Sequence, residues 1–135
     1  MGNIVEHFGL NAGKVWKALD THGSLTNTKL MKTTKLKEDE FYAAIGWLAK
    51  ENKICKDGRG YRLGWTNLID KIGEDAGKLW NIFDTWGEMD ATYLPKLAGV
   101  APEDVYSALG WLVREGKLDA KKVKPKTPQI KYILK

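Results

Sequence analysis

Basic side chains gather in two short segments of the chain, and their chemistry is the easiest to name. The first segment carries Lys56, Arg59 and Arg62 around a glycine turn, and the second lies within residues 116–135. Ammonium and guanidinium groups at this density can neutralise several phosphates of a nucleic acid, which gives an affinity that falls with salt and depends little on base sequence. A lysine-rich surface that serves solubility is the alternative. In the second segment, the lysines expected to contact phosphate are Lys121, Lys122, Lys124 and Lys126.

Catalytic chemistry has no comparable pattern. The chain contains no nucleophile beside a base, no paired carboxylates around a polar segment, and no phosphate-binding loop with its lysine and serine or threonine. The single cysteine, Cys55, excludes an intramolecular disulfide, and only His7 and His22 could join it as metal ligands, without zinc-like spacing. We therefore expect a protein that is not an enzyme and holds neither a metal ion nor another cofactor.

Composition places the chain among ordinary globular proteins, with 43% apolar and 29% charged residues in a length of 135. The positive charge is uneven: residues 1–64 carry a net charge of +4, residues 65–115 carry −5 and residues 116–135 carry +6. No apolar run approaches the roughly 20 residues that cross a bilayer, and the N-terminal segment lacks the pattern of a signal peptide. We expect a cytoplasmic protein without a membrane partner.

The chain repeats itself. Shifting the sequence by 64 residues aligns residues 4–55 with residues 68–119 without a gap, and 18 of the 52 positions are identical, which indicates two copies of one structural unit. We expect two domains, residues 1–64 and 65–135, joined by a short connection that contains Trp65 and no flexible spacer. The copies should therefore pack on each other, each around an equivalent core of its own.

Helical spacing and turn residues predict the elements of each unit. Residues 41–53, FYAAIGWLAKENK, return as residues 105–117, VYSALGWLVREGK, and both place apolar side chains on one stripe of a helix. An earlier helix, a short helix and a turn precede each of these segments. A strand, a turn and a second strand follow within residues 53–63 and again within residues 117–134. The expected fold class is mainly α with small β-hairpins.

The succession LTNTKLMKTTKLKEDEFYAAIGWLAKENKI resembles the winged helix-turn-helix superfamily, in which a turn with a buried aliphatic residue, here Leu36 or Val100, joins the second and third helices. More narrowly, AGKVW with GWLAKENK, and AGKLW with GWLVREGK, look like a small prokaryotic family of winged-helix domains whose function is unassigned. The resemblance implies two tandem winged-helix domains, each hairpin being a wing. By analogy it also implies nucleic-acid binding.

In such domains the third helix reads base edges, and here its outward face is poorly suited to that task. The acidic leading end would repel phosphate, the small residues in the middle offer few hydrogen-bonding groups, and only Lys50 and Arg114 suit DNA. A small, weakly polar face suits a protein surface at least as well. The face consists of Asp39, Ala43, Gly46 and Lys50 in the first copy, and of Glu103, Ser107, Gly110 and Arg114 in the second. A further basic strip near the first turn consists of Lys29, Lys32, Lys35 and Lys37.

The tryptophans divide into two groups. Four recur at matched positions, at residues 16, 47, 80 and 111, and are expected to pack in or beside the cores, the alternative being a stacking platform for single-stranded nucleic acid. Trp65 and Trp86 have no tryptophan counterpart, so we expect them to pack between the copies or to contact a partner. If the protein is an interaction module, the expected partner-binding residues are Gly46, Trp65, Trp86 and Gly110.

Two functions follow from these observations. The first is a nucleic-acid-binding or transcription-associated protein that meets the phosphate backbone with its wings and with Lys50 and Arg114, at low sequence specificity. The second is a protein-interaction or homodimerisation module without a nucleic-acid role. DNA, another protein and a second copy of the chain are the possible partners.

Overall fold

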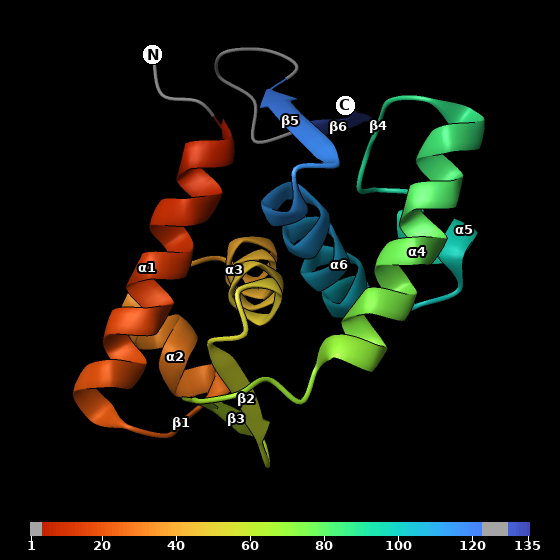
Figure 1. Ribbon diagram of the computed structural model, residues 1–135. Helices are drawn as coiled ribbons and strands as arrows, with labels where there is room; N and C mark the ends of the chain where they lie inside the picture. Colours follow the sequence, from red (N-terminus) through yellow and green to blue (C-terminus); the bar gives the residue numbers. More distant parts are fainter. Residues whose placement is uncertain (1–3, 123–129) are drawn as a thin grey trace.

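Each half of the chain folds into three helices and a β-hairpin, in the order that the repeated sequence predicts (Figure 1). The computed structural model describes residues 4–122 and 130–135. The elements of the first half are α1 (Ile4–His22), β1 (Leu25–Thr26), α2 (Asn27–Thr34), α3 (Glu38–Lys50), β2 (Ile54–Asp57) and β3 (Gly60–Leu63). Those of the second half are α4 (Ile69–Trp86), β4 (Met89–Asp90), α5 (Leu94–Ala98), α6 (Pro102–Glu115), β5 (Leu118–Lys122) and β6 (Ile130–Leu134).

Local chemistry accounts for the starts and ends of the helices. Thr26 caps α2, because its hydroxyl oxygen accepts a hydrogen bond from the backbone N–H of Lys29 at 3.3 Å. The carboxylate of Glu40 accepts one from the backbone N–H of Lys37 at 3.0 Å, which fixes the start of α3. The second half uses Pro102 at the start of α6 and Gly116, in the left-handed conformation, at its end.

Each hairpin is part of a three-stranded antiparallel sheet. β3 lies between β1 and β2 in the first half, and β6 lies between β4 and β5 in the second. In both hairpins a buried tyrosine on the central strand faces a wing residue: Tyr61 pairs with Lys56, and Tyr132 pairs with Ala120. The two winged-helix units in tandem confirm the predicted fold class.

The two halves share one core, which corrects the expectation of two separate cores. One continuous cluster of buried side chains includes Phe8, Leu19 and Phe41 from the first half together with Leu79 and Leu109 from the second. Helices α3 and α6 lie against each other at the centre, with α1 and α4 on the outside (Figure 1). The merging has a simple cause: α3 and α6 both bury residues on the face opposite their own core stripe.

The connection between the halves runs along the surface. Trp65, in this connection, is 83% exposed, so it does not pack between the copies. Two side-chain amides hold the connection against the first half. The side-chain oxygen Oδ1 of Asn52 accepts from the backbone N–H of Thr66 at 2.8 Å. The side chain of Asn67 accepts from the N–H of Lys56 at 2.8 Å and donates to its carbonyl oxygen at 3.0 Å. None of the helices in the described part of the chain is long and apolar enough to cross a membrane.

Candidate nucleic-acid interface

The face of α3 that would read base edges is covered by α6. A Cβ atom added at Gly46 would overlap the carbonyl oxygen of Ser107, and one added at Gly110 would overlap that of Ala43. Only glycine at both positions lets the two helix backbones approach so closely. The sequence interpretation placed Gly46 and Gly110 on a surface that is open to a partner. In the structure, the other half of the same chain occupies that surface.

The basic residues at the ends of these helices pair across the same contact. Lys50 Nζ lies 3.2 Å from Glu115 Oε2 and 5.0 Å from the ring centroid of Trp111. Arg114 repeats this arrangement in the opposite direction, with Nε 3.0 Å from Glu51 Oε2 and the guanidinium carbon 5.6 Å from the ring centroid of Trp47. Lys50 and Arg114, which were predicted to contact DNA, therefore form ion pairs across the junction between the halves.

The first wing keeps most of its positive charge available. Arg59 is exposed at the turn, and Lys56 is exposed beside the ring of Tyr61, with its Nζ 5.3 Å from the ring centroid. Arg62 lies 4.0 Å from the carboxylate of Asp57, at the outer limit of an ion pair. An exposed pair at this distance contributes little, so Arg62 could exchange Asp57 for a phosphate.

The second wing lies at the opposite end of the molecule from the first (Figure 1). Lys121 Nζ is 3.4 Å from Glu88 Oε2, and Lys131 Nζ is 3.9 Å from the other oxygen of the same carboxylate. Lys124 and Lys126 lie outside the described residues, as does the side chain of Lys122 at the end of β5. The two wings thus do not form one continuous basic face.

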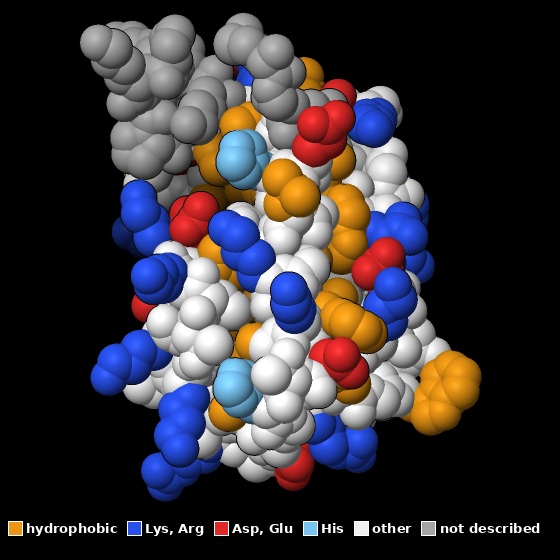
Figure 2. Space-filling view, turned by 90° about the vertical axis from the view of Figure 1, so that its left-hand side faces the viewer, with side chains coloured by type: hydrophobic (Ala, Val, Ile, Leu, Met, Phe, Trp, Pro, Cys, Tyr) orange, Lys and Arg blue, Asp and Glu red, His pale blue; other side chains and the backbone are white. Residues whose placement is uncertain are grey.

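A second basic surface lies beside the first wing, on α1 and α2. A groove of about 300 Å³ between these helices is lined by Lys14, Lys17, Thr21, His22 and Thr33, with no carboxylate among its lining residues. Figure 2, which views the molecule from the side of α1, shows Lys and Arg side chains along the left and lower part of this face. We call this the α1–α2 lysine surface; it consists of Lys14, Lys17, Lys29, Lys32 and Lys35.

The α1–α2 lysine surface is continuous with the first wing. The backbone N–H of Asn27, the first residue of α2, donates to the carbonyl oxygen of Arg59 at 3.1 Å, so the wing turn lies against the start of that helix. None of the five lysines forms an ion pair with a described residue. Sequence reasoning noted the α2 lysines as a strip but missed Lys14 and Lys17, whose signal is a basic i, i+3 pair on the outer side of the first helix.

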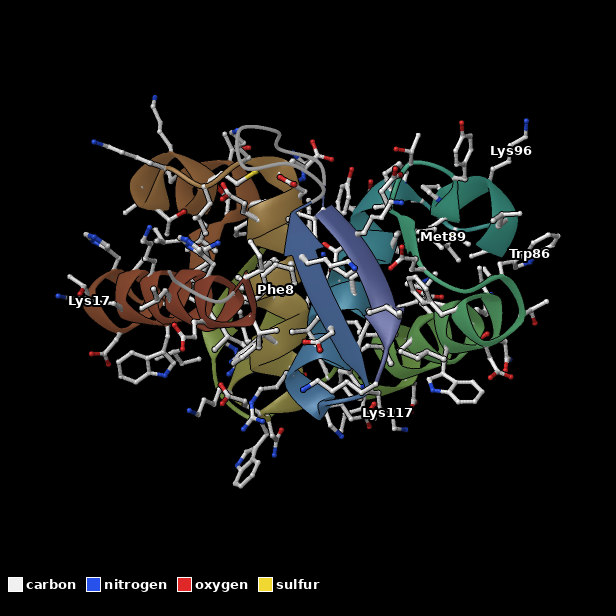
Figure 3. The ribbon with its side chains drawn as sticks, turned by 90° about the horizontal axis from the view of Figure 1, so that it is seen from above. Phe8, Lys17, Trp86, Met89, Lys96 and Lys117 are labelled. Carbon is white, nitrogen blue, oxygen red and sulfur yellow. The ribbon has the colours of Figure 1, made fainter. Side chains whose placement is uncertain are left out.

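The equivalent surface of the second half keeps two lysines, Lys78 and Lys96, but is otherwise more apolar. His22, Lys29 and Thr33 correspond, 64 residues later, to Trp86, Tyr93 and Leu97, which are 67%, 67% and 49% exposed. Figure 3 shows Lys17 and Trp86 pointing outward at opposite ends of the molecule. The two copies have therefore diverged on this surface, which carries five lysines in the first half but two lysines and three exposed apolar side chains in the second.

A buried carboxylate lies at the start of α4. The side chain of Asp75 is 3% exposed, and Lys71 Nζ contacts its Oδ2 at 2.7 Å and Asp104 Oδ2 at 3.5 Å. The hydrogen bond to Asp75 raises the pKa of Lys71, burial opposes the rise, and the charge of Asp104 adds to it. Lys71 thus stays charged and joins α4 to α6.

Replacing Lys71 by glutamine should destabilise the protein by roughly 2 kcal/mol, because Asp75 would stay buried without its cation. We expect a smaller loss of stability than for a fully buried ion pair, because the Lys71 side chain is 55% exposed and solvent screens its charge. His7→Gln is the matched control, since the first half has neutral Asn11 at the position of Asp75. Urea unfolding of both variants measures the difference, and equal midpoints would contradict the assigned role of Lys71.

Metal binding finds no support in the geometry. Among residues 4–122 and 130–135, no group of three or more His, Cys, Asp or Glu side chains is arranged to hold a metal ion. Cys55 is buried on β2, where its Sγ lies 3.6 Å from the carbonyl oxygen of Lys56.

Comparison with known proteins agrees with this architecture. A family model described as "Winged helix-turn-helix domain (DUF2582)" matches the chain twice, at residues 4–65 and at residues 68–127. The chain matches none of the curated proteins and none of the solved structures with which it was compared.

Proposed function

Since the chain belongs to the DUF2582 family of winged helix-turn-helix domains and contains two of them, we propose that it binds nucleic acid through the phosphate backbone. The contact surface is the α1–α2 lysine surface together with Lys56, Arg59 and Arg62 of the first wing. The observation that carries the proposal is the absence of ion pairs between these five lysines and any described residue. Unpaired ammonium groups keep their full attraction for phosphate and lose no internal partner on binding.

The closed contact between α3 and α6 supports low sequence specificity. Base readout in the major groove needs an exposed helix face with hydrogen-bonding side chains, and the faces around Gly46 and Gly110 are buried against each other. Backbone contacts position a protein on a duplex without reading its sequence. We therefore place Lys50 and Arg114 at the junction between the halves and not in the phosphate contact. Lys121 makes a separate, weaker contribution, because Glu88 already pairs with it.

Titration of labelled DNA with the full-length protein at several salt concentrations tests the proposal. We expect affinity to fall steeply with salt and to be similar for two duplexes of unrelated sequence, since each phosphate contact contributes about 0.9 to the slope of log K against log salt. Single-stranded DNA of equal length is the comparison for stacking on exposed aromatic rings. Failure to bind either DNA at low salt would remove the proposal, and a strong preference for one duplex would contradict backbone binding.

A protein partner is the second candidate function, favoured by the aromatic surface of the second half. Trp86, Tyr93 and Leu97 together expose large apolar side chains at one end of the molecule, and exposed aromatic residues of this kind are enriched at protein interfaces. Trp65 is exposed as well, on the connection between the halves. The two functions are compatible, because the basic and the aromatic surfaces lie at opposite ends (Figure 3).

A further inference from the structure

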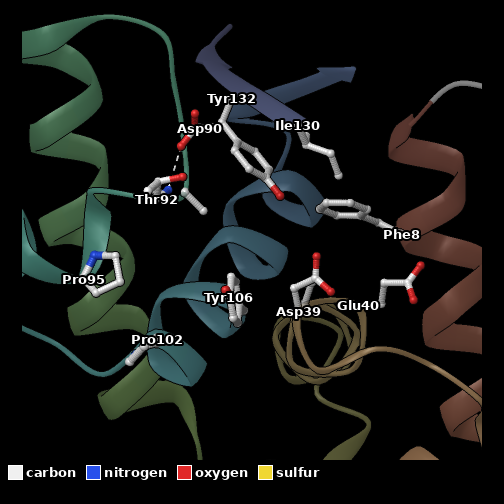
Figure 4. A pocket seen from close by; sticks show the side chains of 12 residues that line it. Phe8, Asp39, Glu40, Asp90, Thr92, Pro95, Pro102, Tyr106, Ile130 and Tyr132 are labelled. Atoms are coloured by element: carbon white, nitrogen blue, oxygen red, sulfur yellow. Dashed lines mark hydrogen bonds between the residues drawn. The ribbon is translucent and has the colours of Figure 1, made fainter. Parts of the chain in front are cut away.

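A cavity of about 440 Å³ lies between the two halves, away from the proposed nucleic-acid contact. It opens between the start of α3, the start of α6, the segment after β4, and the second wing (Figure 4). Its size is within the range of pockets that hold small molecules. The lining side chains that carry the argument are Phe8, Asp39, Tyr106 and Tyr132.

The cavity combines aromatic rings with a carboxylate. Figure 4 shows the hydroxyl of Tyr132, the ring of Phe8 and the carboxylate of Asp39 directed toward the same space. The rings of Phe8 and Tyr132 are tilted against each other, with 6.3 Å between their centroids. Asp39 forms neither an ion pair nor a side-chain hydrogen bond with any described residue. Asp39 therefore presents a free carboxylate from the first turn of α3 at the mouth of an aromatic cavity.

Tyr132 directs its hydroxyl into the cavity from the central strand of the second wing (Figure 4). The residue is 6% exposed, and its hydroxyl forms no hydrogen bond with a described residue. Burial raises the pKa of Tyr132, and the nearby charge of Asp39 raises it further, so the phenol stays neutral beside the carboxylate. The hydroxyl oxygen is not among the buried, unpaired polar atoms of the described residues, so it is open to the cavity and can bond a ligand there.

The equivalent cavity of the other half shows what occupies such a site. It is lined by Tyr42, Tyr61, Glu103 and Asp104, and the protein supplies its cations. Lys56 Nζ lies over the ring of Tyr61 at 5.3 Å, and Lys71 Nζ lies 3.5 Å from Asp104. Asp104 and the ring of Tyr61 thus each contact an ammonium group of the same chain, whereas Glu103 forms no ion pair with a described residue.

Both of these lysines are missing from the cavity at the second wing. At the equivalent positions, 64 residues away, Lys71 is replaced by His7 and Lys56 by Ala120. The replacement of Lys56 is direct, because Ala120 faces Tyr132 across the strands as Lys56 faces Tyr61. Tyrosine and carboxylate side chains are retained at matching positions: Tyr106 for Tyr42, Asp39 for Glu103, and Glu40, which also lines the cavity, for Asp104, the partner of Lys71. The site has kept its cation-binding groups and lost its internal cations.

We propose that this cavity binds a small organic cation, an ammonium or guanidinium group on a short aliphatic chain, with its charge between the carboxylates of Asp39 and Glu40 and the ring of Tyr132. A cation over an aromatic ring and a charge-assisted hydrogen bond to a carboxylate are the two interactions that such a ligand makes. The aliphatic part lies against Phe8 and Ile130, which complete the apolar wall. This site is independent of the proposed contact with nucleic acid.

Calorimetric titration of the full-length protein with n-butylammonium and n-butylguanidinium tests the proposal. We expect one cation per chain, and binding at least tenfold tighter than that of neutral n-butanol, because the charge supplies the main attraction. Asp39→Asn should weaken cation binding by about tenfold by removing a charge, and Tyr132→Leu should do so by removing the ring, whereas Tyr132→Phe keeps the ring and should bind nearly as the parent does. Glu103→Gln, at the position equivalent to Asp39, is the matched control and should bind as the parent does.

His7→Lys provides a test of the comparison between the cavities. A lysine at this position should reach Glu40, as Lys71 reaches Asp104, and should supply the missing cation from within the chain. We expect this variant to keep or raise the melting temperature and to lose cation binding. No binding of either cation by the parent, equal binding of n-butanol, or unchanged affinity in both Asp39→Asn and Tyr132→Leu would overturn the proposal.

Discussion

Gly46→Ala should destabilise the protein by about 3 kcal/mol, although alanine is intrinsically the better helix residue by about 1 kcal/mol. The added methyl group would overlap the backbone carbonyl of Ser107, and its Cβ would lie 2.7 Å from the carbonyl carbon. Backbone atoms on a packed helix cannot yield as the end of a flexible side chain can. Helices α3 and α6 would therefore have to separate, and the shared core would lose contacts along their whole crossing. Gly110→Ala should act in the same way, because its methyl group would meet the carbonyl of Ala43.

Two other helical glycines provide matched controls for this prediction. A Cβ added at Gly13 on α1, or at Gly77 on α4, meets no atom within 4 Å. Alanine at either position should leave the fold intact and stabilise it by up to about 1 kcal/mol, through helix propensity alone. Urea unfolding monitored by tryptophan fluorescence measures all four variants. If Gly46→Ala proves as stable as Gly13→Ala, the two helices do not cross at these glycines.

The second large effect is expected on DNA affinity. Replacing Lys14, Lys17, Lys29 and Lys32 by glutamine should lower affinity for duplex DNA by about 100-fold at low salt, since each lysine that meets a phosphate contributes about one unit to the salt slope. All four side chains are exposed, so the protein should remain folded. The loss should shrink as salt rises, because the missing term is electrostatic. Fluorescence anisotropy with the same duplex at two salt concentrations measures both effects.

The repeat itself supplies a control of equal charge. Lys14 and Lys32 correspond to Lys78 and Lys96 in the second half. The pair Lys14→Gln and Lys32→Gln should weaken binding by about tenfold, whereas Lys78→Gln and Lys96→Gln, with the same change in net charge, should leave affinity nearly unchanged. Equal losses in both double variants would show that net charge alone drives binding and would contradict the assignment of the first half as the contact surface.

Much of the architecture could be predicted from the residues because its causes are local. The apolar stripe of residues 41–53, the acidic first turn of α3 and the glycine turn at Gly58 act within a few positions, so spacing alone predicts helix and hairpin. The repeat at a shift of 64 residues then predicts a second copy of the same unit. The family match confirms that interpretation over both halves.

The site was harder to predict, because its residues depend on what the opposite face of α3 contacts. As far as the sequence pattern goes, a small face that contains Ala43 and Gly46 fits DNA, a protein partner or another helix equally well. One signal was present: Lys50 and Glu51 return as Arg114 and Glu115, a charge arrangement that is complementary to itself. Such a face pairs well with its own copy, and the structure shows this reciprocal pairing. Sequence reasoning noted the residues and did not compare the two copies as opposing surfaces.

The amino-acid sequence by itself determined the elements, their order and their duplication, since hydrogen-bonding pattern and apolar period are properties of neighbouring residues. Only the tertiary structure decided that the halves share one core, that Lys50 and Arg114 are used internally, and that the free lysines lie on α1 and α2. These outcomes depend on how two surfaces 64 residues apart meet in space. The contact between the halves depends on close packing at the glycines and on ion pairs across the junction. Neither produces a periodic pattern in the sequence.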